Sequence, residues 1–249
     1  MYLFRHLVVF LQQSYPAFKH MTTSSWEILS KWEIVQPVSH RAPTPKVLVD
    51  AMLSLACSWN WWRWAGVTAV SFHGAMRIGE PLAGRRQDLL FPDEAGIPLP
   101  DIFVRVGAPK PGRRGRGRVQ HTRISDFTAI SVISRAFKDL DRDEQLYPGS
   151  AASYRRRWNS ILAALDISPS FGLTPGGLRG GGSIHLYHLG VPIADILWRM
   201  RLRQLVTLES YLQETAGENI FLSLPLSSRK AVKSCAAMLP FLLHTMPAP

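Results

Sequence analysis

The chain has 249 residues, of which 46% are hydrophobic, so it is long and apolar enough to build a core, which excludes a wholly disordered protein. Its 29 Lys and Arg against 18 Asp and Glu give a net charge of +11, which predicts attraction to phosphate polymers or anionic membranes. Cys57 and Cys235 stand far apart and outside any paired motif, which argues against a disulfide framework and against a zinc site.

Residues 1–42 are predicted to be an N-terminal extension. They mix apolar pieces with Pro16 and Pro37 and are too short for an independent core. The apolar run that follows Arg5 is shorter than the core of a secretory signal, and no small-residue cleavage site follows it. Because no stretch is long, apolar and free of charge, the sequence predicts no membrane span. The two isolated cysteines favour a reducing compartment.

The next segments are predicted to be helices. Thr44-Pro45 is a typical helix start, and apolar side chains follow at helical spacing, which predicts a helix over residues 45 to about 61. A second apolar segment, residues 65–76, leads to Arg77 and ends at Pro81, because a proline disfavours helical geometry in the residue before it.

A small antiparallel sheet is predicted next, because short apolar and β-branched segments alternate with Pro- and Gly-rich turns. Its strands are residues 89–91, 102–106 and 119–124. Further helices are predicted over residues 127–140, 151–165, 175–189, 193–200, 204–215 and 229–243. The predicted fold class is therefore α+β, mainly α, with a small inserted antiparallel β-meander.

Four segments carry residues suited to phosphodiester chemistry, which needs a hydroxyl nucleophile, cations around the phosphate and an acid for the leaving oxygen. They are Ser-Phe-His-Gly-Ala-Met-Arg-Ile-Gly-Glu (71–80), Pro-Lys-Pro-Gly (109–112), Leu-Thr-Pro-Gly-Gly-Leu-Arg (173–179), and Trp-Arg-Met-Arg-Leu (198–202) with Thr-Leu-Glu-Ser-Tyr-Leu-Gln-Glu (207–214). Each alone also fits a blander interpretation, such as a surface Arg/Glu pair, a solvated basic turn or a packing tyrosine.

In this order and spacing, residues 43–225 resemble the catalytic domain of the tyrosine recombinases, the phage-integrase family, and in particular the recombinase-like proteins of protist mobile elements. The resemblance implies a helical DNA breaking-and-rejoining domain that works through a 3′-phosphotyrosine without metal, ATP or a small-molecule cofactor. It implies Tyr211 as nucleophile, Arg77 and Arg179 as phosphate ligands, Lys110 as general acid and Glu80 as support for Arg77.

The same resemblance suggests the remaining organisation. Residues 1–42 match the place of a core-binding domain, of which they would be a remnant, and residues 226–249 follow as a C-terminal helix and tail. The implied partner is double-stranded DNA, with a homo-oligomer formed on that DNA. Residence in the nucleus follows from the mobile-element likeness and the basic tract, and a cytoplasmic location is the alternative.

Two positions depart from the family pattern. Gly176 stands where the family has a histidine, and Leu202 stands where it has histidine or tryptophan, so neither supplies a side-chain donor. Arg199, Arg201 and Arg203 surround Leu202 and are candidate replacement cations. His185 and His188 lie on other faces of the helix than Arg179 and are interpreted as packing or surface residues.

Basic residues around the predicted hairpin form a candidate DNA-binding surface. It comprises Arg105, Arg113, Arg114, Arg116 and Arg118, together with Arg201 in the last of the four segments. Whether the chain is an enzyme stays open at this point. The alternatives are a catalytically inactive DNA-binding relic of the same fold and an RNA-binding module built on the Arg/Gly hairpin.

Overall fold

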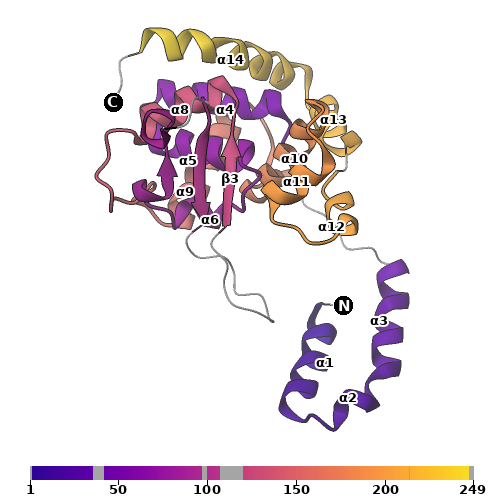
Figure 1. Cartoon of the computed structure of the whole chain (residues 1–249). Helices are drawn as coiled ribbons and strands as arrows, with labels where there is room; N and C mark the ends of the chain where they lie inside the picture. The colour runs from indigo at the N-terminus through magenta and orange to yellow at the C-terminus, as the bar shows by residue number, and fades with distance from the viewer. Residues whose placement is uncertain (1, 36–41, 97–99, 107–119, 213, 247–249) are drawn as a thin grey trace. The chain divides into compact units, whose positions relative to one another are not determined.

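In a computed structural model, the chain is described over residues 2–35, 42–96, 100–106, 120–212 and 214–246. It divides into two compact units, residues 1–40 and 41–249 (Figure 1). Lys110, Arg113, Arg114, Arg116 and Arg118 lie outside the described residues.

The first unit is helical, although no helix was predicted there. It contains α1 (Tyr2–Ser14), α2 (Phe18–Met21) and α3 (Thr23–Val35). The Gln12 side chain of α1 donates a hydrogen bond to the Thr22 hydroxyl, just before α3 begins. Val8 and Leu29 are the buried apolar side chains among those described here, so this unit has very little core of its own.

The second unit is mostly helical and carries one small sheet, which confirms the predicted α+β class with a predominance of helix. Its helices before the sheet are α4 (Lys46–Ser58), α5 (Trp62–His73) and α6 (Gly79–Leu82), with η1 (Arg86–Asp88) and α7 (Pro92–Ala95) around the first strand. Its later helices are α8 (Phe127–Phe137), α9 (Ala151–Ala164), η2 (Pro169–Phe171), η3 (Pro175–Gly177), α10 (Leu178–His188), α11 (Ile193–Met200), α12 (Leu205–Glu209), α13 (Glu214–Ser223) and α14 (Leu226–Thr245).

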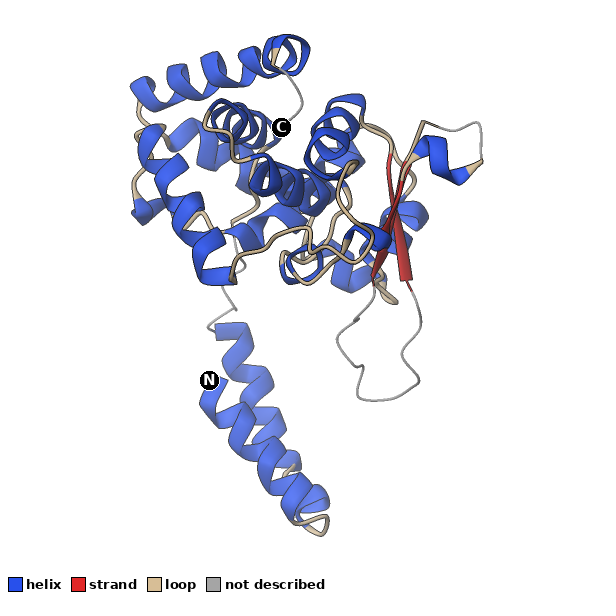
Figure 2. Ribbon diagram, turned by 90° about the vertical axis from the view of Figure 1, so that its left-hand side faces the viewer, coloured by secondary structure: helices blue, strands red, loops and turns tan. Residues whose placement is uncertain are grey.

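The sheet is an antiparallel meander in the order β1-β2-β3, as predicted, with strands Leu89–Leu90, Ile102–Val106 and Gln120–Ile124. Val104 lies opposite Leu89 on one side and Thr122 on the other. Figure 2 shows the strands at the side of the helical unit. Thr122 is buried and donates a hydrogen bond to the carbonyl of Gly74, which fixes the sheet to the end of α5.

Several predicted helix ends were wrong by a few residues. α4 ends at Ser58 instead of residue 61, because Asn60 adopts a left-handed backbone (φ 59°) that asparagine tolerates better than most residues. α5 therefore begins already at Trp62, and its end at His73 comes before residue 76. The predicted helix over 175–189 begins as the short turn η3 and becomes α-helical only at Leu178.

The core lies between α4, α5, α8 and α9, and α14 packs along the outer side of α4 (Figure 1). At its centre Trp64 stacks on Tyr154 with ring centres 5.1 Å apart, and Trp158 lies 6.2 Å from Trp64. The Tyr154 hydroxyl is 2.6 Å from the Thr68 hydroxyl, so the polar tip of this buried ring is satisfied. Trp64 thus serves packing.

Glycines let α10 approach its neighbours closely. A Cβ on Gly181 would lie 1.9 Å from the carbonyl oxygen of Thr44, and a Cβ on Gly182 would lie 1.9 Å from that of Phe72. Glycine is a poor helix former, so its presence here reflects backbone contact with α5 and the segment before α4. This contact sets the position of Arg179, in the first turn of α10.

Among the described residues, none of the helices combines the length and the apolar character required to cross a lipid bilayer.

Candidate active site

Arg179 is the centre of the candidate site. Its side chain is 3% exposed, and one guanidinium nitrogen, Nη2, donates to the carbonyl of Met200 at the end of α11. Nε and Nη1 are buried and have no hydrogen-bond partner among the described residues. Burial lowers the pKa of Arg179 to about 10, with the nearby Arg77 acting in the same direction, so the group is still a cation at pH 7.

Tyr211 faces this guanidinium. The Arg179 guanidinium carbon lies 5.5 Å from the centre of the Tyr211 ring, although the two residues come from separate segments. The predicted helix over 204–215 is wrong at this point, because α12 ends at Glu209 and Tyr211 stands in the following turn. The Ser210 hydroxyl donates to the Thr207 carbonyl, a local hydrogen bond of the kind that competes with helix continuation.

Glu80 joins two further arginines to the site. Its carboxylate accepts hydrogen bonds from the backbone amide of Arg77 at 2.9 Å and from the Arg77 guanidinium at 3.3 Å. It also pairs with Arg201, whose side chain is 4% exposed. Arg77 keeps half of its side chain exposed, so Glu80 holds one solvent-facing and one buried guanidinium.

The chain is strained beside both of these arginines. Ala75 and Arg201 have φ values of 47° and 56°, in the left-handed region that residues with a Cβ seldom adopt. Each lies just beyond the end of a helix, α5 for Ala75 and α11 for Arg201. Such backbone conformations cost roughly 1–3 kcal/mol and gather at functional sites, where they aim side chains.

Positive charge exceeds negative charge in this cluster. Arg77, Arg179 and Arg201 contribute three guanidiniums, and Glu80 is the carboxylate that pairs with two of them. The charges of Arg77, Arg201 and Glu80 all act on the pKa of Arg179. A buried cation with unpaired donors is costly, and an oxyanion such as phosphate satisfies both the charge and the donors.

A cavity of about 420 Å³ opens next to the cluster and is lined by Arg77 and Glu80. Arg105, which the sequence assigned to DNA binding, lines the same cavity. Its guanidinium lies 2.9 Å from an Asp88 carboxylate oxygen, and its side chain is 46% exposed. Arg105 is therefore already paired with an acid of the protein.

The two positions that depart from the recombinase pattern bring no donor to the site. Gly176 lies in the turn η3. Leu202 packs, partly buried, with Met200 and Leu208 in a small apolar cluster that also includes the Tyr211 ring. Arg199 was suggested as a replacement cation. It is buried and donates at 3.0 Å to the carbonyl of Arg123 in β3, so that prediction is wrong. Arg203 is exposed.

A second polar cluster was not predicted from the sequence. His185, in α10, packs with its ring 5.7 Å from Phe72 and 5.8 Å from His73, and His73 lies beside Asp126. Burial lowers the pKa of His73 to about 3 and also lowers that of His185. The three polar residues belong to distant parts of the chain and share no motif, so no spacing signal pointed to them.

No protein-family model matches this chain, and no curated protein matches its sequence significantly.

Proposed function

We propose that this chain is a DNA strand-exchange protein of the tyrosine-recombinase type, with Tyr211 as its nucleophile. The supporting observation is the pairing of Arg179 with Tyr211, in which the buried guanidinium lies 5.5 Å from the phenol ring centre and two of its donor nitrogens have no partner in the part of the chain that the structure describes. In the proposed complex a DNA phosphate contacts these donors and the phenol oxygen of Tyr211. The coarse fold, mainly helical with a small antiparallel meander, agrees with this assignment.

In the proposed reaction the Tyr211 oxygen attacks a DNA phosphorus and the bond to the 5′ oxygen breaks. The phenol proton passes to solvent, and the leaving 5′ oxygen takes a proton, for which the family resemblance suggests the Lys110 ammonium. A 3′-phosphotyrosine ester results, which keeps the energy of the broken bond. Attack by another 5′-hydroxyl then reverses the step on a new strand and restores the phenol.

The arginines have distinct roles in this proposal. Arg179 and Arg77 hold the two non-bridging oxygens, on which negative charge grows in the transition state. Arg201 is paired with Glu80 and is 4% exposed, so it supports Arg77 through their shared carboxylate and does not bind DNA directly.

Gly176 and Leu202 predict slow chemistry. Loss of one preorganised donor costs about 10²–10³ in rate, and loss of a general acid or base costs about 10²–10⁴, although the two penalties need not multiply. This favours a second candidate function, a DNA-binding protein that has kept the phosphate site and lost turnover. The RNA-binding alternative depends on residues 113–118, which lie outside the described residues.

The test is a covalent-adduct assay on nicked duplex DNA of mixed sequence. At a nick the released strand diffuses away, so a phosphotyrosine adduct accumulates and survives SDS. We expect an adduct with the wild-type chain, none with Tyr211→Phe, and an unchanged amount with Tyr187→Phe, a matched control because Tyr187 is 40% exposed on α10. An adduct that persists in Tyr211→Phe contradicts the proposed nucleophile.

Duplex binding separates the two candidates. If no adduct forms but binding weakens steeply with salt and is lost in Arg179→Met, the binding protein is favoured. If Arg179→Met and Arg77→Met bind duplex DNA like the wild type, both candidates fail. The homo-oligomer and the nuclear location are further parts of the proposal, and sedimentation with and without DNA tests the former.

A further inference from the structure

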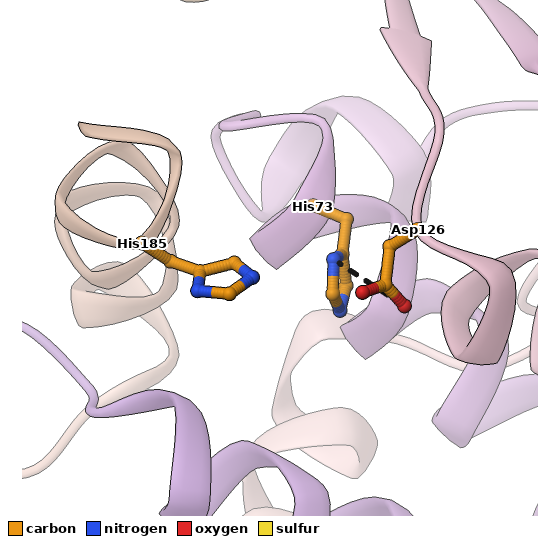
Figure 3. A group of neighbouring side chains, drawn as sticks. All are labelled: His73, Asp126 and His185. Carbon is orange, nitrogen blue, oxygen red and sulfur yellow. Dashed lines mark ion pairs between the residues drawn. The ribbon is translucent and has the colours of Figure 1, made fainter. Parts of the chain in front are cut away.

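His73, Asp126 and His185 form a compact group of metal-binding atoms (Figure 3). One ligand atom from each lies within 4.8 Å of the other two. The His73 Nδ1 atom is 4.0 Å from the Asp126 carboxylate, and the His185 and His73 ring centres are 5.8 Å apart at an interplanar angle of 90°. Figure 3 shows His73 between the other two side chains.

The three side chains come from three separate elements. His73 is the last residue of α5, Asp126 is the residue before α8, and His185 lies in the last turn of α10. The Ala129 amide donates to Asp126 Oδ1 at 2.8 Å, which orients the carboxylate as the N-cap of α8. Outer hydrogen bonds of this kind commonly orient metal ligands.

His185 provides the second observation. Its Nε2 atom is buried and has no hydrogen-bond partner among the described residues, although an imidazole nitrogen seldom stays unpaired in the interior. His185 also lines a cavity of about 350 Å³, together with Gly181 and Phe221, and this cavity offers an ion an entry path. The nearby Lys46 is held by Asp50 at 2.6 Å, so its charge is locally balanced.

We infer that His73, Asp126 and His185 bind a divalent transition metal ion, with Zn²⁺ as the best fit. Two imidazoles and one carboxylate are a recurrent zinc ligand set, and a fourth position is left for water. Tetrahedral zinc with bonds of about 2.0–2.1 Å needs ligand atoms about 3.4 Å apart. The group must therefore contract by roughly 1 Å, which requires a rotation of the partly exposed His185 side chain and, because His73 Nδ1 and the Asp126 carboxylate are 4.0 Å apart, a shift of that pair as well.

A metal here would join the segments that carry the candidate active site. Arg77 follows His73 by four residues, and Arg179 precedes His185 by six on the same helix. An ion bound to both histidines ties α10 to the end of α5, so it fixes the spacing between the two arginines. This role is structural, and the inference stands whether or not Tyr211 is a nucleophile.

The test is zinc and cobalt binding by the untagged full chain after treatment with a chelator. We expect one Zn²⁺ per chain after dialysis, a higher unfolding temperature with Zn²⁺, and none of these effects with Mg²⁺. Co²⁺ should give the intense visible absorption of a four-coordinate site, and X-ray absorption on the zinc form should show two imidazoles. These measurements use the wild-type chain alone, so they do not depend on the folding of any variant.

Variants then locate the ion. We expect Asp126→Asn and His185→Gln to bind Zn²⁺ at least about 100-fold more weakly, because loss even of an outer partner costs about 10–100-fold. Asn caps a helix as well as Asp, so Asp126→Asn should keep α8 intact. His121→Gln is the matched control, since His121 is exposed on β3 outside the group. Equal zinc affinity in all three variants, or no imidazole around the zinc, would overturn the inference.

Discussion

Glu80 and Arg201 form an ion pair across 121 residues of chain. Both side chains are almost fully buried, at 10% and 4% exposure, and the same carboxylate also holds Arg77. The pair therefore joins α6 to the end of α11. It brings the first and the last of the four predicted segments together.

Breaking this pair should destabilise the chain. Removal of one partner from a buried ion pair leaves an uncompensated charge and typically costs about 3–5 kcal/mol, so we expect Glu80→Gln to lose about 3 kcal/mol, since the amide keeps part of the hydrogen bonding. Urea unfolding measures the loss. Glu144→Gln is the control, because Glu144 pairs with Arg63 at the surface, and its unfolding midpoint should not change. Equal effects of both variants would contradict the buried role of Glu80.

Anions should bind at Arg179. Because Nε and Nη1 of Arg179 are buried and unpaired among the described residues, we expect inorganic phosphate to raise the unfolding temperature of the wild-type chain. A phosphate concentration of ten times Kd corresponds to about 1.4 kcal/mol of added stability. Arg179→Met should abolish most of this shift, as differential scanning calorimetry would show.

Lys230→Gln provides the control for that experiment. It removes one positive charge from an exposed position on α14, far along the chain from the cluster. If Lys230→Gln reduces the phosphate effect as much as Arg179→Met, the response reflects net charge and not a specific site.

The glycines of α10 should resist substitution. Alanine is the better helix former by about 1 kcal/mol, yet a Cβ at position 182 would lie 1.9 Å from the carbonyl oxygen of Phe72. We expect Gly182→Ala to cost at least about 3 kcal/mol, the upper end of ordinary overpacking, because backbone has to move. Gly79→Ala meets no atom within 4 Å and should be neutral or slightly stabilising. Chemical denaturation of both variants decides.

The two cysteines should differ in reactivity. Burial raises the pKa of the Cys57 thiol to about 12, and its side chain is fully buried, whereas Cys235 is partly exposed. At about pH 9 we expect iodoacetamide to modify Cys235 in the folded chain and Cys57 only after unfolding, because the thiolate is the reactive form. Mass spectrometry of the peptides measures this difference.

The raised pKa of Cys57 also makes the free energy of unfolding depend on pH. The pKa of Cys57 is higher in the folded chain than in the unfolded chain. The contribution of Cys57 to the free energy of unfolding is therefore fully present below about pH 9 and is lost as the unfolded thiol ionises at higher pH. Cys57→Ala should flatten the decline of unfolding free energy above that pH. Rapid labelling of Cys57 in the folded chain would contradict its burial.

Much of the second unit could be predicted from local pattern. The helix over 193–200 and the strand over 102–106 have the predicted bounds, because amphipathic spacing and β-branched runs are local signals. The helices of the first unit were missed because Pro16 and polar residues broke the pattern there. The turn at Asn60 and the end of α12 before Tyr211 were missed as well, since single-residue backbone choices decide helix ends.

The candidate site divides in the same way. The order and spacing of the four segments predicted Arg77, Glu80, Arg179 and Tyr211 as site residues. The fold brings these four side chains into one cluster. No spacing indicated which arginines already have partners. Arg199, for example, donates to a carbonyl of β3, and this contact between distant segments leaves no local signal in the sequence.

The sequence by itself determined the helical character of the second unit, its β-meander and the excess of positive charge, because these follow from composition and from periodicity over a few residues. Tertiary structure alone decided which guanidiniums keep unpaired donors, and that His73, Asp126 and His185 meet. The physical reason is that hydrogen-bond and ion-pair partners act over a few ångströms in space, and the chain brings such partners together from positions with no periodic relation.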